Sequence, residues 1–465
     1  MKRKEAVDRK SLDSSVRDGS AYAAVDTVIG NYSIPYALAL GASNAEIGLL
    51  SSIPKLFSII VQPFAGTWAD ETKSIKRLNL ISGLVGKLMI VPIALIPFLF
   101  VTDRVMALIL LLSIFSLFIS ISNMSWMEWM ANLVPISMRG KFFGKRNMLA
   151  GISGFATTLV VGWVLGLYSN LQGFTIVFIL AALGGLLSSY YTSKISDVER
   201  EVRKHKEHII KWNLQGFLYS LRTQKNFSNF IVFATSFTLF VQIASPFFAV
   251  YALEVLDIGY GWYALGIAAT AIAMTFSQPY WGKLSDRFGD KKIILVCGIL
   301  AALVPLFWML FVKTPLDVIL VDLYAGFAWA GFDLALFNFL LDAAPPKHRP
   351  LYVSNYKILF DGAMFAGPLI GATIATLFAS QSLFFLYGLQ IVFLVSFVGR
   401  IITLYFASKL KEERVKGSEE IPVRYVFLKS LTTYPMREVA TDIHYVNKCL
   451  VCWKREITKG LYRGS

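Results

Sequence analysis

The sequence QPFAGTWAD at residues 62–70 returns as QPYWGKLSD at residues 278–286. Each copy closes a long apolar run and leads into basic residues. One pair of similar nonamers can arise from composition alone. A second pair of similar segments follows at the corresponding place in each half, PISMR at 135–139 and PPKHR at 345–349. Internal repeats that occur in the same order along the chain are typical of secondary transporters built from duplicated units. The sequence therefore predicts two similar halves.

Composition and apolar runs extend this prediction to the whole chain. Of the 465 residues, 55% are hydrophobic and only 16% are charged, which is unlike a soluble protein. A membrane span needs about 20 apolar residues, and the sequence predicts an all-α integral membrane protein with twelve transmembrane helices in two pseudo-symmetric six-helix bundles. The expected spans are 19–41, 45–69, 78–101, 105–134, 142–168, 173–193, 228–253, 260–284, 293–312, 316–344, 351–378 and 382–408.

The basic residues predict how these spans are oriented. Of the 45 Lys and Arg, 39 fall on the side of the chain that holds both termini, and the opposite loops hold only Arg104 and Lys313. The positive-inside rule therefore predicts cytoplasmic termini in a multi-pass protein of the plasma membrane. The net charge of +15 follows from this topology, so no nucleic-acid partner is expected. We expect a monomer with an N-tail (1–18), a first half (19–193), a cytoplasmic linker (194–226), a second half (227–408) and a basic C-tail (409–465).

The second repeat carries a family resemblance. GKLSDRFGDKK at 282–292 resembles the loop signature of the major facilitator superfamily, Gly-x-x-x-Asp-Arg-x-Gly followed by two basic residues. The first copy, GTWADETKSIKR at 66–77, keeps the Gly, the Asp and the basic end, but it has Glu71 in place of Arg and lacks the second Gly. The resemblance covers about residues 15–408 and singles out no subfamily. It implies a secondary transporter that works by alternating access.

The same motif has a physical interpretation as a charge latch, which we call the latch motif. Glycine lets one helix end pack closely on another, and the aspartate can accept hydrogen bonds at a helix N-terminus while basic residues neutralise it. The alternative is an ordinary tight turn with solvated charges. The resemblance assigns the latch residues to gating of the cytoplasmic face: Gly66, Asp70, Arg77, Gly282, Asp286, Arg287 and Lys291.

Acidic residues inside spans are the candidates for chemistry, because each is costly to place in a bilayer. In the superfamily the first and fourth spans of each half line the central cavity, which would bring Asp26, Glu128 and Asp333 to the pathway. Desolvation favours the protonated form of a carboxyl group, as proton coupling requires. Glu128 is the first choice for proton coupling, the alternative being a structural pair with Lys145 or Arg146.

Residues around Glu128 are candidates for solute binding. Trp126 and Trp129 offer flat surfaces, and Asn123 and Asn132 can orient a substrate. This mixture of aromatic, acidic and amide groups predicts a small organic solute, cationic or neutral and polar, rather than an anion.

Basic residues and glycines inside the predicted spans are expected to have structural or gating roles. Lys357 and Arg400 lie near the cytoplasmic interface and are expected to extend their charged ends to it. Lys55 is deeper, and the family geometry would let it pair with Asp361 across the two halves. The glycines of span 11, residues 362–371, are expected to serve close helix packing.

Other function classes are disfavoured. The four histidines, His205, His208, His348 and His444, are scattered, and the tail pair Cys449 and Cys452 is at most half a zinc site. No phosphate-binding loop occurs. We therefore expect no enzyme, no metal and no cofactor, and we take the partners to be a small-molecule substrate, protons and the lipid bilayer. A facilitative uniporter, or a non-transporting sensor or scaffold with an effector tail, is the alternative function.

Overall fold

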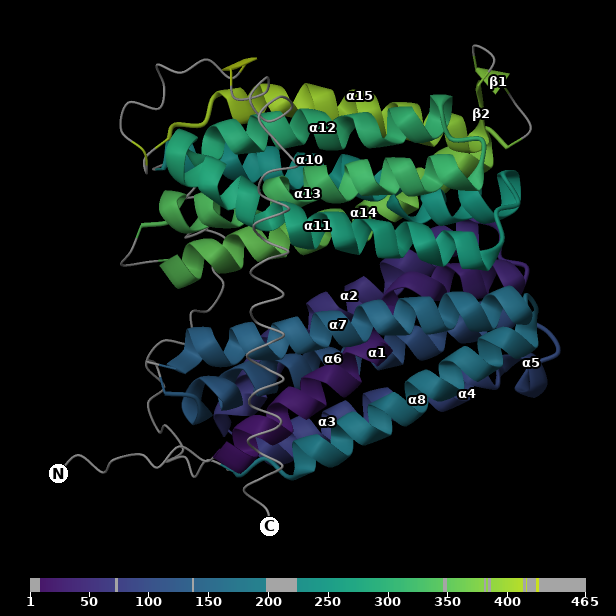
Figure 1. The fold of residues 1–465 in the computed structure, drawn as a ribbon, viewed down its shortest axis with the longest axis vertical. Helices are drawn as coiled ribbons and strands as arrows, with labels where there is room; N and C mark the ends of the chain where they lie inside the picture. Colours follow the sequence, from purple (N-terminus) through teal and green to yellow (C-terminus); the bar gives the residue numbers. More distant parts are fainter. Residues whose placement is uncertain are drawn as a thin grey trace, which may run out of the picture.

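The computed structural model describes residues 9–71, 74–135, 138–197, 224–345, 349–379, 382–383, 386–412, 415 and 424–425. Within these ranges the helices make twelve crossings in two bundles of six, as predicted (Figure 1). The first bundle comprises α1 (Arg9–Ala39), α2 (Asn44–Glu71), α3 (Ile75–Leu88), α4 (Ile90–Ala94), α5 (Ile96–Leu99), α6 (Arg104–Leu133), α7 (Arg139–Leu167) and α8 (Leu171–Ser193). The second comprises α10 (Lys225–Val250), η2 (Tyr251–Val255), α11 (Tyr260–Phe288), α12 (Asp290–Leu310), α13 (Pro315–Ala343), α14 (Arg349–Leu377), β1 (Ser382–Leu383), β2 (Leu386–Tyr387) and α15 (Gly388–Ser408).

Ten of the helical segments in the described ranges are long and apolar enough to cross a membrane. The two crossings outside this set are α1 and α11, which carry more polar residues. The third crossing is broken into α3, α4 and α5, with Pro92 and Pro97 near the breaks. Proline lacks the amide hydrogen that an α-helix needs, which accounts for the interruptions.

The first helix begins at Arg9, ten residues before the predicted span. Residues 9–18 were assigned to the cytoplasmic N-tail, and the structure has them in the first helix. The buried polar side chains among them have partners inside the bundle, since Ser15 lies 3.4 Å from the sulfur of Met130 and Ser11 lies 2.9 Å from the hydroxyl of Ser196. A polar helix turn can therefore be buried at little cost. The rest of the N-tail, most of the linker and nearly all of the C-tail lie outside the described residues.

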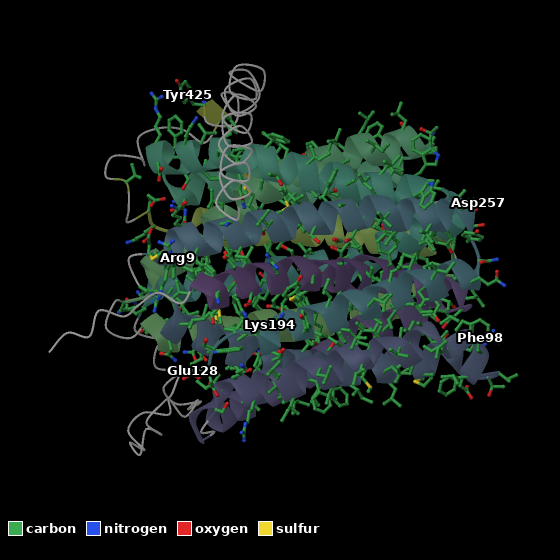
Figure 2. The ribbon with its side chains drawn as sticks, turned by 60° about the horizontal axis from the view of Figure 1, so that its bottom comes forward. Arg9, Phe98, Glu128, Lys194, Asp257 and Tyr425 are labelled. Carbon is green, nitrogen blue, oxygen red and sulfur yellow. The ribbon has the colours of Figure 1, made fainter. Side chains whose placement is uncertain are left out.

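The two ends of the bundles differ in how the halves meet. We call the end where α1 begins and α8 ends the linker face, and the other end the opposite face; Figure 2 shows Arg9 and Glu128 toward the first and Phe98 and Asp257 toward the second. One hydrophobic cluster joins both halves and includes Tyr36, Phe174 and Phe247. The clusters near the linker face each belong to a single half. Among the described residues, the halves are thus sealed together at the opposite face.

Two helix pairs hold the halves together, α2 with α14 and α7 with α11. Glycine makes both contacts possible. A Cβ on Gly48 would lie 2.3 Å from the Cβ of Ala372, and one on Gly162 would lie 2.5 Å from the Cβ of Ala264. Both separations are far below a van der Waals contact, so any larger residue must push the helices apart.

Replacing Gly162 by valine is therefore expected to open the opposite face. In a variant without the native cysteines, a cysteine in place of the buried Ala268 of α11 should react several-fold faster with a membrane-impermeant maleimide. Gly166 lies on the same helix and serves as the control, because a Cβ there would meet no described atom within 4 Å. Equal labelling rates in the Gly162→Val and Gly166→Val variants would contradict the sealed contact.

Candidate functional site

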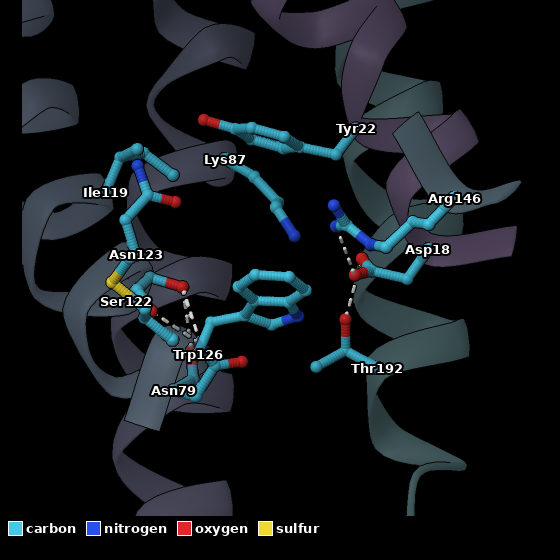
Figure 3. Close-up of a pocket in the computed structure, with 11 residues that line it drawn as sticks. Asp18, Tyr22, Asn79, Lys87, Ile119, Ser122, Asn123, Trp126, Arg146 and Thr192 are labelled. Atoms are coloured by element: carbon cyan, nitrogen blue, oxygen red, sulfur yellow. Dashed lines mark hydrogen bonds and ion pairs between the residues drawn. The ribbon is translucent and has the colours of Figure 1, made fainter. Parts of the chain in front are cut away.

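The first half encloses a cavity of about 330 Å³ between α1, α3, α6, α7 and α8, which we call the N cavity (Figure 3). Charged or aromatic side chains from α1, α3, α6 and α7 converge on it, and α8 contributes Thr192. Their identities set what the cavity can bind, because each was carried into the membrane-spanning region. The lining includes Asp18, Tyr22, Lys87, Asn123, Trp126 and Arg146.

Asp18 is the acidic residue in this lining, and protein groups occupy its carboxylate. Its Oδ1 accepts hydrogen bonds from Ser188 Oγ at 2.6 Å and from Thr192 Oγ1 at 2.9 Å. Its Oδ2 lies 3.7 Å from Nη2 of Arg146. Only 5% of Asp18 is exposed, so this network satisfies a buried carboxylate as burial requires.

Arg146 reaches this site along α1. Its Nε donates to the carbonyl oxygen of Ser15 at 3.3 Å, and its guanidinium carbon lies 4.1 Å from the centre of the Trp126 ring, a cation–π distance. Gly19 leaves room for it, because a Cβ there would lie 2.7 Å from Cζ of Arg146.

Lys87 enters the same cavity from α3. Its Nζ donates to Ser188 Oγ at 2.7 Å and to Ser189 Oγ at 3.4 Å, and it lies 5.5 Å from the centre of the Tyr22 ring. The residue is 7% exposed. Ser188 therefore links the lysine to Asp18 in one hydrogen-bonded network.

The second half contains a cavity of about 290 Å³ between α10, α13 and α14, which we call the C cavity. Aromatic residues dominate its lining, including Trp329, Phe332, Tyr356 and Phe360. Asp333 is the acidic residue there, and it is exposed. No hydrogen bond or ion pair joins its carboxylate to any other described residue.

Further charges lie between the two halves. Lys55 of α2 acts electrostatically on Asp26 of α1, and both residues are exposed. Asp361 accepts a hydrogen bond from Lys357 at 2.8 Å, one turn earlier on α14, and from Nε2 of Gln62 at 3.5 Å. In this conformation Asp361 thus pairs with Lys357, whereas the sequence suggested Lys55.

The structure separates the residues predicted around Glu128. Asn123 and Trp126 line the N cavity. Trp129 is fully buried and donates from Nε1 to the carbonyl oxygen of Ser196 at 3.2 Å, so it does not face the cavity. Asn132 is exposed and donates to the backbone carbonyl of Glu128 at 3.0 Å.

Packing of neighbouring elements explains this separation. At 3.6 residues per turn, positions 119, 122, 123 and 126 share one face of α6, and position 129 lies at the edge of that face, one turn nearer the linker face, where Trp129 packs with Ile75 and Ile195. Glu128 is half-buried outside both cavities. Its alternative partner Arg146 is paired with Asp18.

The sequence analysis did not place three charged residues of the N cavity there: Asp18, Lys87 and Arg146. Asp18 was assigned to the tail, Lys87 received no role, and Arg146 was considered only as a partner of Glu128. The small residues on the neighbouring helices were a sequence signal that space and hydrogen-bond partners exist for these charged side chains. Gly185, for example, lies where a Cβ would approach Cβ of Lys87 to 3.1 Å, and a serine follows three residues later.

Arg400 is also placed differently from the prediction. It was expected to extend to the interface, but it is 1% exposed in the core of the second half. Its Nη1 donates to the carbonyl oxygen of Ala301 at 2.8 Å and its Nη2 lies 3.5 Å from that of Val241. Backbone carbonyls on α12 and α10 thus replace water as acceptors, which explains how the guanidinium remains buried.

The second latch motif contains a buried aspartate, Asp290, in addition to Asp286, which the resemblance assigned to gating. Asp290 is 0% exposed and accepts hydrogen bonds from Ser285 and, at 3.3 Å, from Asn338. It opens α12, where a negative charge is favourable. Gly289 adopts φ +86°, which favours glycine. Asp286 is exposed.

The other predicted gating residues lie around these positions. A Cβ on Gly282 would lie 3.7 Å from Cδ2 of Leu334, and Arg287 is exposed with its guanidinium carbon 5.3 Å from the Phe288 ring centre. The backbone amide of Lys291 donates to Glu412 at 2.9 Å. Arg77 is exposed in the first turn of α3. Gly66 and Asp70 belong to α2, and the surroundings of both residues lie outside the described part of the structure.

Comparison with known proteins identifies relatives along most of the chain. A family model described as Major Facilitator Superfamily matches residues 19–349 and 264–441. Multidrug resistance protein MdtG of Enterobacter lignolyticus (strain SCF1) is 25% identical over 411 residues, which is 82% of this chain and 88% of that protein. The Staphyloferrin B transporter of Staphylococcus aureus (strain NCTC 8325 / PS 47) is 30% identical over 161 residues, 35% of this chain and only 36% of that protein.

Solved structures show the same fold at low sequence identity. The nucleoside transporter NupG superposes with a TM-score of 0.66 at 14% identity, over 87% of this chain and 100% of that chain. A D-xylose-proton symporter superposes with a TM-score of 0.62 at 15% identity, over 87% of this chain and 97% of that chain.

Proposed function

We propose that this chain, which belongs to the Major Facilitator Superfamily and is a secondary transporter of the plasma membrane, couples the movement of a small organic solute to protons. Transport proceeds by alternating access, with the two six-helix halves rocking about the two cavities. By the positive-inside rule the linker face is cytoplasmic. The conformation sealed at the opposite face is then the inward-facing one.

Asp333 is the observation that supports proton coupling best. It lies about ten residues, or about 15 Å, from the end of α13 at the linker face. Its carboxylate is exposed in an aromatic cavity and has no cation or hydrogen-bond donor among the described residues. A carboxylate within a membrane span is stabilised by taking up a proton, and exposure lets that proton exchange with water.

Asp26 supports the proposal from the other half. It is exposed on α1 beside Lys55, so protonation of Asp26 would leave the lysine without its counter-charge. The sequence singled out Glu128, but its position outside both cavities makes it the weaker proton carrier. No catalytic role is proposed for any residue of the chain.

Replacing Asp333 by asparagine is expected to abolish the stimulation of transport by a pH gradient. The measurement is uptake and efflux of a panel of labelled organic solutes in proteoliposomes with and without an imposed gradient. Asp103→Asn, an exposed change at the opposite face, is the matched control, and Glu128→Gln should lose far less. If the transport rate of the unmodified protein is the same with and without the pH gradient, the protein is a facilitative uniporter. Absence of any transport would favour a sensor or scaffold.

A further inference from the structure

We infer that the N cavity recognises a carboxylate group on a small organic ligand. The inference rests on the proposed transport function, because it names the chemical class of the substrate. It differs from the sequence-based expectation of a cationic or neutral solute. Four features of the cavity carry it: its charge, its unused hydrogen-bond donors, its aromatic walls and its size.

The charges that line the cavity have a positive excess. Lys87 and Arg146 both point into it, and Figure 3 shows their charged ends between the rings of Tyr22 and Trp126. Asp18 is the one acidic residue among the lining residues described. The neighbouring Asp26 is compensated by Lys55. Two cations that converge in a region of low dielectric repel each other, and an anion between them converts that repulsion into attraction.

Asp18 is already committed to protein groups. Ser188, Thr192 and Arg146 occupy its two oxygens, and it lies beside Arg146 in Figure 3. One carboxylate therefore faces two cations, which leaves one positive charge in excess.

Donors for a carboxylate remain in the same cavity. Lys87 has three N–H groups and uses two on Ser188 and Ser189. Arg146 Nη1 has no hydrogen bond to any residue in the described ranges. Nε1 of Trp126 is buried and likewise has no partner among the described residues. A buried donor without an acceptor lowers stability, so a ligand oxygen that accepts from it would restore the missing hydrogen bond.

The walls of the cavity suit a flat apolar body attached to that carboxylate. Tyr22 and Trp126 offer aromatic surfaces, and Ile119 and Met127 add apolar contacts. Asn123 contributes an amide beside the Tyr22 hydroxyl. At about 330 Å³ the cavity lies at the small end of the usual range for ligand sites, which fits a small organic acid. An organic cation would meet Lys87 and Arg146 at close range and is disfavoured.

Benzoate and its neutral amide, benzamide, test the inference directly, because they share shape and differ in charge. The thermal unfolding midpoint of the purified full-length protein in detergent is measured at rising concentrations of each at constant ionic strength, which yields an apparent Kd. We expect benzoate to raise the midpoint and benzamide to leave it unchanged. Lys87→Gln and Arg146→Gln should each weaken the apparent Kd for benzoate at least tenfold. Arg104→Gln, at a half-buried arginine near the opposite face and outside the N cavity, should bind like the unmodified protein.

Several outcomes would overturn the carboxylate site. These are no stabilisation by benzoate, equal stabilisation by benzamide, or an unchanged benzoate Kd in the Lys87→Gln variant. Glutamine at position 87 can still donate a hydrogen bond to Ser188, so we expect the Lys87→Gln variant to fold. Its benzoate Kd therefore tests the site even when Arg146→Gln fails to fold. The assay uses no membrane and no gradient. A negative result would therefore leave the proton coupling through Asp333 untouched, and loss of proton coupling would leave this binding result standing.

Discussion

Replacing Gly371 by valine is expected to remove about 3 kcal/mol or more from the stability of the protein. Gly371 lies on α14 against the backbone of α10, where an added Cβ would sit 2.1 Å from the carbonyl oxygen of Ile243. The carbonyl belongs to a helix backbone and cannot rotate away as a side chain would. The two helices must therefore separate, which also removes the contacts of Phe247 at this point.

Gly362, on the same helix, is the matched control. A Cβ there would meet no described atom within 4 Å, so the Gly362→Val variant experiences the same change in helix propensity without the clash. Denaturant titration of both variants in detergent, followed by circular dichroism, gives the difference. Equal stability of the two variants would show that α10 and α14 do not pack as the structure has them.

Replacing Asp18 by asparagine is the second large effect, with an expected loss of about 3–5 kcal/mol. Asparagine keeps the shape and an acceptor oxygen for Ser188 and Thr192, but it removes the negative charge. Arg146 and Lys87 would then be buried together without a carboxylate at the site.

A double variant shows whether the stability lost in Asp18→Asn comes from the missing negative charge. Adding Lys87→Met to Asp18→Asn removes one of the two unbalanced cations and should restore a substantial part of the lost stability. The same denaturant titration reports it, with the Lys87→Met single variant completing the cycle. Additive losses in the double variant would mean that the Asp18 charge does not balance Lys87.

The architecture could be predicted from the sequence because the bilayer imposes it on composition. Apolar runs mark the helices, and the repeated segments at 62–70 and 278–286 mark two equivalent halves. The beginning of α1 was missed because residues 9–18 are polar. Their burial depends on Ser196 and Met130, which lie more than a hundred residues away in the chain.

The candidate site could be predicted only in part, for a similar reason. Asn123 and Trp126 were singled out by their closeness to Glu128 in the sequence, but the burial of Trp129 depends on the elements packed against α6. Lys87 and Asp18 come from different helices, and nothing local in the sequence shows that Ser188 joins them. In the second latch motif, which aspartate is buried follows from Asn338 on α13.

The central claim, proton-coupled alternating access, is tested most directly by distances between the halves at both faces. Spin labels at Lys141 and Lys283 report the linker face, and labels at Leu167 and Trp262 report the opposite face, in a variant without native cysteines. Double electron–electron resonance between pH 8 and pH 5 should show one distance shortening as the other lengthens, and Asp333→Asn should abolish this response. Distances that stay unchanged at both faces, or that change in the same direction, would contradict the account.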